Sequence, residues 1–275
     1  RGLGDVYKRQ KLELDLKKGA LETDIKSLKK AARQTISPEL GKRIQIIIET
    51  GLIDLSDDFK IYWNRYPIAK LISGKDYLNP GLELIIDDII ELNHKQKLNA
   101  FLDNWLKKKI RTVLKSLFDL KELKDRNSSV NALAFHLYEN NGVIKRDNVY
   151  EYLKNLKQDE RKTLRDLGVK FGRYHIYLHK LIKPEAVSLR TMLWKNFHQK
   201  YLKLKPPTFG LNFLNNQDSK DKNFMLLCGF EKFNNLYVRI DILERLFVKI
   251  INSNIEKSNE IKMVPEMLNL LGLSL

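Results

Sequence analysis

Apolar residues recur at helical spacing along much of this 275-residue chain. The spacing predicts one helix over 21–32 and a second that begins at Ser37-Pro38, an N-cap followed by a first-turn proline, and ends near Gly51. A longer amphipathic helix is expected from Leu98 to Leu117, since its apolar residues form one stripe and its lysines lie on the other side. These patterns favour a mainly α chain.

Strand-like patterns interrupt the helices at three places. Aromatic and β-branched residues surround the turn signals Asn64–Pro67 and Asn79–Gly81, which predicts a small β insert over 59–86. Two further hairpins are expected near Gly172 and near Asn234-Asn235. The predicted fold is therefore a helical accessory domain with two or three small β hairpins, each hairpin flanked by helices.

The hairpin near Gly172 is the most informative segment. Gly168 suits a left-handed end to the preceding helix, and Gly172-Arg173 has the form of a tight two-residue turn. With that turn Phe171 opposes Tyr174, and alternation places the apolar residues on one face. The other face and the tip combine cations with rings, as single-stranded nucleic acid favours, in Lys170, Arg173, His175, Tyr177 and His179.

The same element order recurs later in the chain. Gly229, two strands joined at Asn234-Asn235 and a helix from Asp241 through Leu246 repeat the order helix, hairpin, helix, which is that of winged-helix-like units. When the two glycines are aligned, Glu231 falls on the face that should be apolar. The repeat is one of architecture rather than of sequence.

The expected organisation has four parts. Residues 1–10 resemble translated adapter sequence and are expected to be a non-native tail, and the last part is expected to be truncated at its C-terminus. The folded parts are a helical segment over 11–125, a basic helix–hairpin–helix unit over 126–205 and a second hairpin–helix unit over 206–275.

Positive charge concentrates in the middle of the chain. The net charge is +16, and residues 143–205 hold 16 basic and 6 acidic residues, a net +10, whereas 206–275 hold 8 of each. A basic segment of this kind indicates an anionic partner. Seven residues of it are the candidate nucleic-acid contacts: Lys170, Arg173, His175, Tyr177, Lys180, Lys183 and Arg190.

The sequence offers no catalytic or metal site. Gly74-Lys75-Asp76 lacks the earlier glycine and the hydroxyl of a phosphate-binding loop, and no nucleophile motif is present. The single cysteine, Cys228, excludes an internal disulfide and is expected to be a small buried hydrophobe, which fits the cytoplasm. No apolar run reaches the length of a membrane helix, so no membrane partner is expected.

Several segments together resemble the C-terminal region of bacterial relatives of the mitochondrial degradosome-type ATP-dependent RNA helicases, in the DExH-box superfamily two. They cover most of the chain after the first ten residues: Phe59–Leu84, Leu137–Val149, Glu160–Pro184, Val238–Leu246 and Pro265–Ser274. In that family the motor precedes this region. The resemblance implies an accessory fragment that binds single-stranded RNA or DNA, with no cofactor of its own and with ATP and Mg²⁺ used by the missing N-terminal motor.

Two other functions stay open from the sequence. A protein-docking module would join the helicase to a ribonuclease or another partner through the strand and helix over Leu236–Leu246. A scaffold would use its charge only for solubility. A parent chain of the implied kind is an ATP-hydrolysing helicase of RNA degradation, whereas this fragment is expected to bind without hydrolysing.

Overall fold

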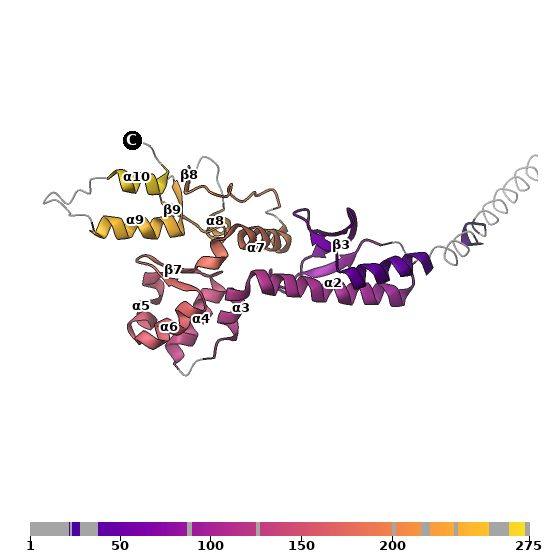
Figure 1. Cartoon of the computed structure of the whole chain (residues 1–275), viewed down its shortest axis with the longest axis horizontal. Coiled ribbons are helices and arrows are strands. Elements are labelled where there is room, and N and C mark those ends of the chain that lie inside the picture. The colour runs from indigo at the N-terminus through magenta and orange to yellow at the C-terminus, as the bar shows by residue number, and fades with distance from the viewer. Residues whose placement is uncertain are drawn as a thin grey trace, which may run out of the picture. The chain divides into compact units, whose positions relative to one another are not determined.

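The computed structural model describes residues 22, 24–27, 38–86, 90–124, 127–199, 202–215, 221–233, 236–252 and 264–272. The expected tail over 1–10, most of the helix expected over 21–32 and the turn at 234–235 lie outside the described residues. Two compact units are formed, one by residues 1–72 with 81–105 and one by residues 73–80 with 106–275. The described residues are mainly α-helical with small antiparallel sheets, as the patterns predict (Figure 1).

The first unit holds a helix over 38–50 and one antiparallel sheet in the order β1-β2-β3-β4. Asn64 and Arg65 join β2 to β3 with φ angles of 46° and 69°, the left-handed pair of a two-residue hairpin turn. The insert expected over 59–86 is thus a sheet, to which a short first strand is added. Its strands are β1 (Ile53–Leu55), β2 (Lys60–Trp63), β3 (Tyr66–Ile72) and β4 (Gly81–Leu84).

The helix expected from Leu98 to Leu117 is divided in two. Helix α2 (Leu92–Val113) ends before Leu114, whose φ of −101° and ψ of 24° are not helical, and α3 (Lys115–Glu122) follows. The apolar stripe continues through the break because Leu114 and Leu117 are both buried. The spacing of apolar residues in the sequence therefore could not show that the helix is interrupted at Leu114.

In the second unit, the residues after α3 form a first module whose sheet has the order β5-β7-β6. Gly168, with a φ of 96°, ends the helix before the hairpin as expected. The elements are α4 (Ser128–Glu139), β5 (Val143–Lys145), η1 (Arg146–Val149), α5 (Tyr150–Lys154), α6 (Gln158–Asp166), β6 (Val169–Phe171), β7 (His175–Leu178), η2 (His179–Ile182) and α7 (Pro184–Phe197).

A second module of the same unit repeats the hairpin plan, with a sheet in the order β8-β10-β9. Gly229, with a φ of 86°, occupies the place of Gly168 between helix and hairpin. Helices α9 and α10 lie side by side (Figure 1). The elements are β8 (Phe213–Asn215), α8 (Lys222–Leu227), β9 (Phe230–Phe233), β10 (Leu236–Arg239), α9 (Ile240–Asn252) and α10 (Pro265–Leu271).

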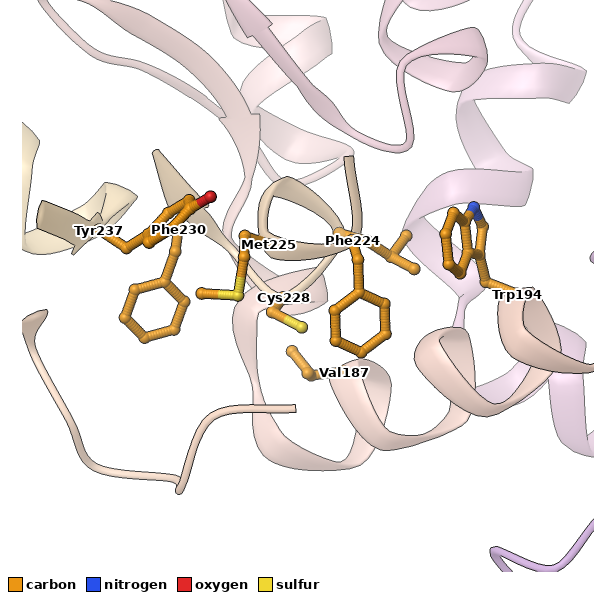
Figure 2. Packing of buried hydrophobic residues seen from close by; sticks show 8 residues of the cluster. Val187, Trp194, Phe224, Met225, Cys228, Phe230 and Tyr237 are labelled. Atoms are coloured by element: carbon orange, nitrogen blue, oxygen red, sulfur yellow. The ribbon is translucent and has the colours of Figure 1, made fainter. Parts of the chain in front are cut away.

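A continuous core joins α7 to the second module. Figure 2 shows Phe224 and Met225 of α8 on either side of Cys228, with Val187 of α7 directed toward them. Cys228 is 3% exposed, as expected for a small buried hydrophobe. A smaller cluster contains Tyr177 of β7 together with Val143 and Ile240. The two modules are therefore packed together as one body.

Candidate nucleic-acid interface

The central hairpin has a different register from the one predicted. Phe171 pairs with Ile176 instead of Tyr174, and the two-residue turn is formed by Arg173 and Tyr174. The backbone N–H of Gly172 donates to the carbonyl of His175 at 2.8 Å, which closes this turn. Because each pairing moves by two residues, the alternation of faces is unchanged.

The burial of strand β7 corrects part of the predicted site. It is the central strand of its sheet, and all four of its residues are buried. His175 is 0% and Tyr177 7% exposed, because the second module covers the face that the alternation predicted to be open. Neither ring is available to stack on a base. The contact of Tyr177 with Val143 and Ile240 is a core contact, and its burial raises its pKa to about 12, with a further contribution from nearby Asp241.

Arg190 is also a structural residue rather than a phosphate contact. It is fully buried and donates to the backbone carbonyls of Asn141, Leu181 and Leu227 at 2.7–2.8 Å. Asn141 follows α4, Leu181 lies in η2 and Leu227 is the last residue of α8. One guanidinium therefore joins three segments of the unit. Burial lowers the pKa of Arg190 to about 10, a value at which it keeps its charge at neutral pH.

A charge cluster lies between the two modules. It is made of the buried His175, Glu231 and Glu244 together with the partly exposed Lys145. The imidazole of His175 has Glu244 Oε1 3.2 Å from Nδ1 and Glu231 Oε2 3.5 Å from Nε2. Lys145 Nζ lies 3.0 Å from Glu231 Oε1. The charge of Glu231 on an apolar face, which broke the sequence repeat, is thus neutralised by two cationic groups of the other module.

The pKa values in this cluster move in the direction that favours the charged forms. Burial alone opposes protonation of His175, but its contacts with Glu231 and Glu244 outweigh burial, so the pKa of His175 is raised. Burial likewise opposes ionisation of the two glutamates, yet their hydrogen bonds and charge contacts lower the pKa of each. The cluster therefore favours a protonated imidazole between two carboxylates.

Glu244 also holds the hairpin turn. Its carboxylate accepts backbone N–H groups from Arg173 at 2.5 Å, Tyr174 at 3.1 Å and His175 at 2.6 Å. The approach is so close that a Cβ on Gly172 would lie 2.3 Å from the carboxylate. Only glycine fits at this position without displacing the acid.

A basic groove of about 930 Å³ lies beside this turn, between α6, the β6–β7 hairpin and α9. Two acids, Asp241 and Glu244, two rings, Tyr177 and His179, and a few apolar residues with Gly172 complete its lining. Its seven cations are Arg146, Arg161, Arg165, Lys170, Arg173, Arg245 and Lys249.

The acids of the groove are already bound by protein groups. Arg239 lies 2.6 Å from Asp241, and Glu244 accepts the turn amides. In the described part of the chain, Lys170, Arg173 and Arg245 have no carboxylate within ion-pair distance, and all three are exposed. The groove is therefore electropositive, with three side chains open to an anion.

The remaining predicted contacts are only partly brought to this place. Lys170 and Arg173 line the groove, whereas Lys180 and Lys183 are exposed but are not part of its lining. Of the seven candidates, Lys170 and Arg173 are exposed cations of the groove, and Lys180 and Lys183 lie outside it. Tyr177 contributes to the groove lining but is buried, as are His175 and Arg190.

Five cations of the groove were missed as site residues. They include Arg161 and Arg165 on α6 and Arg245 and Lys249 on α9, each pair four residues apart on one helix. Two like charges at this spacing repel each other and destabilise the helix slightly. Because an anion bound between them would offset that repulsion, such a pair in the sequence is a signal for an anionic partner. Arg146, which supports the turn by donating to Gly172 O at 2.9 Å, carried no such signal.

Comparison of the chain with protein-family models, with curated proteins and with solved structures found no match. The argument for function therefore depends on the groove itself. Within the described ranges, no helix is long and apolar enough to span a membrane. The same residues contain no group of three or more His, Cys, Asp or Glu placed to share a metal ion.

Proposed function

We propose that this chain binds single-stranded nucleic acid through the basic groove, as the C-terminal accessory region of an ATP-dependent RNA or DNA helicase. The observation that carries the proposal is the set of unpaired, exposed cations Lys170, Arg173 and Arg245 around one groove whose acids are already engaged. Phosphate oxygens are the anions that such a row of Lys and Arg side chains binds best.

The topology of the first module supports the proposal. Its order of helix, strand, helix, helix, strand, strand, with the sheet order β5-β7-β6, is that of a winged-helix module. In that interpretation α6 takes the place of the recognition helix and the β6–β7 turn that of the wing. Both elements line the groove through Arg161, Arg165, Lys170 and Arg173.

The groove favours recognition of the backbone over recognition of bases. His175 and Tyr177, the rings expected to stack, are buried, and Phe171 lies under Arg165, whose guanidinium is 6.0 Å from the ring centre. Phosphate contacts position a strand but carry no sequence information. Binding is therefore expected to depend strongly on salt and weakly on sequence.

The wider role follows from the resemblance. The fragment would hold the strand in the cytoplasm while a motor encoded upstream uses ATP and Mg²⁺ in RNA degradation, with a ribonuclease as a further partner. The docking alternative has less support, because β10 lies between β8 and β9 and most of Leu236–Leu246 is buried.

The test is a double charge reversal, Lys170→Glu with Arg173→Glu, in the full chain. We expect weaker binding of a fluorescent uridine oligonucleotide, measured by anisotropy, and a smaller salt dependence, because each lost phosphate contact removes about 0.7 from the slope of log affinity against log salt.

The matched control is Lys154→Glu with Lys162→Glu, which changes the net charge equally at two exposed lysines that do not line the groove. This control should keep nearly all of the affinity. Equal loss in both variants would show that total charge rather than the groove determines binding, and no loss in either would overturn the proposal.

A further inference from the structure

The basic groove is built by both modules. Arg161, Arg165, Lys170 and Arg173 come from α6 and the β6–β7 hairpin, whereas Arg245 comes from α9 of the second module. A strand held by all of these side chains must contact both modules at once. The relative placement of the hairpin and α9 therefore determines whether the cations act on one strand.

One acidic side chain fixes that placement. Glu244 lies on α9 beside Arg245, and its carboxylate accepts the backbone amides of Arg173, Tyr174 and His175. It thus connects the helix that carries Arg245 to the turn that carries Arg173. The carboxylate also lies 3.2 Å from His175 Nδ1, so this acid of the groove lining is engaged by protein groups.

We propose that Glu244 is a positioning residue for nucleic-acid binding: it joins the turn to α9 so that Arg173 and Arg245 contact the phosphates of one single strand. This inference rests on the proposed function. The ligand it specifies is a phosphodiester backbone that lies across the junction of the two modules. Glu244 makes no contact with that ligand and acts only through the groups it holds.

The proposal predicts that removal of the Glu244 charge changes nucleic-acid affinity in the direction opposite to that expected from net charge alone. Removing a carboxylate from a positive groove should strengthen binding of a polyanion if only net charge matters. If Glu244 positions the turn, Glu244→Gln should weaken binding, because an amide cannot accept the turn amides as a charged carboxylate does. The expected change is a loss of affinity of about tenfold, of the size of one charge-assisted contact.

The experiment measures anisotropy of a short fluorescent uridine oligonucleotide against Glu244→Gln over a range of salt. The control is Glu151→Gln, which removes the same charge at an exposed side chain that does not line the groove. Its affinity should be nearly unchanged, because the turn keeps its contacts with Glu244. Affinity of Glu244→Gln equal to or above that of the unsubstituted chain, with the same salt slope, would overturn the inference.

A second measurement does not disturb Glu244 and so holds even if its variants fail to fold. Arg173→Gln and Arg245→Gln change one exposed cation each, in different modules. On an oligonucleotide of about six nucleotides, each should lower the salt slope by about 0.7, since both residues contact the same strand. An effect of only one of them would overturn the inference. If the unsubstituted chain binds no single strand at all, the proposed function fails first.

Discussion

At the scale of residues, His175 is the clearest case in which composition predicts one role and surroundings another. A histidine on the polar face of a hairpin is typical of a binding surface, yet here the imidazole is fully buried between Glu231 and Glu244. The alternation of faces was correct. The burial could not be predicted from the hairpin, because the covering residues come from β9 and α9, more than fifty positions later.

The charge cluster around His175 should make stability depend on pH. The pKa of His175 is raised in the folded protein, so protonated His175 adds to the free energy of unfolding. This contribution is complete below the ordinary histidine pKa of 6.5 and is lost as pH rises through the raised pKa. The pKa values of Glu231 and Glu244 are lowered in the folded protein, so their ionised forms also add to the free energy of unfolding. That contribution is complete above the ordinary glutamate pKa of 4.5 and is lost as pH falls through the lowered pKa values.

Stability in urea should therefore be highest between these limits and decline as pH rises above 6.5. In His175→Gln the decline on the alkaline side should be absent, because no imidazole remains to lose a proton. Parallel curves for the two proteins from pH 6 to pH 9 would assign the pH dependence to other groups.

Arg190 gives a second prediction at this scale. Arg190→Ala should leave three backbone carbonyls without their donor and lower the free energy of unfolding by about 3 kcal/mol or more, measured by urea denaturation. The exposed Lys183→Ala, from the same list of predicted contacts, should change it by less than about 0.5 kcal/mol. A small effect at Arg190 would contradict its structural role.

At the scale of elements, the hairpin illustrates what local sequence determines and what it does not. Glycine at 168 correctly predicted the end of α6, and the two faces of the strands followed from alternation. The register was wrong by two residues because Glu244, distant in sequence, binds the amides of Arg173 and Tyr174 and so selects them as the turn. Tertiary contacts decided between two turns that the sequence alone allowed.

The close approach of the turn to α9 predicts that Gly172→Ala is destabilising. Its Cβ would lie 2.3 Å from the Glu244 carboxylate and 2.7 Å from the carbonyl of His175, so either the turn or the acid must move. We expect a loss of about 1–3 kcal/mol in the free energy of unfolding, as is usual for overpacking. Arg173→Ala, in the same turn, removes no buried group and should be nearly neutral; similar losses at both positions would contradict a steric cause.

At the scale of the whole molecule, the count of charge along the chain identified a basic segment but not the surface that its side chains form. The segment over 143–205 contains Lys170 and Arg173 of the groove, while Arg245 of the groove comes from a part of the chain with no net charge. A count along the sequence cannot show that Asp241 and Glu244 are bound by Arg239 and by the turn, leaving Arg245 open. Which charges remain available is a property of the fold.

The most direct test of a phosphate-binding groove is the salt dependence of single-strand affinity in the unsubstituted chain. Three open cations, with about 0.7 per phosphate contact, predict that log affinity falls against log salt with a slope of about −2 or steeper, alike for uridine and adenosine oligonucleotides. A slope near zero, or binding that follows base identity rather than salt, would contradict the account.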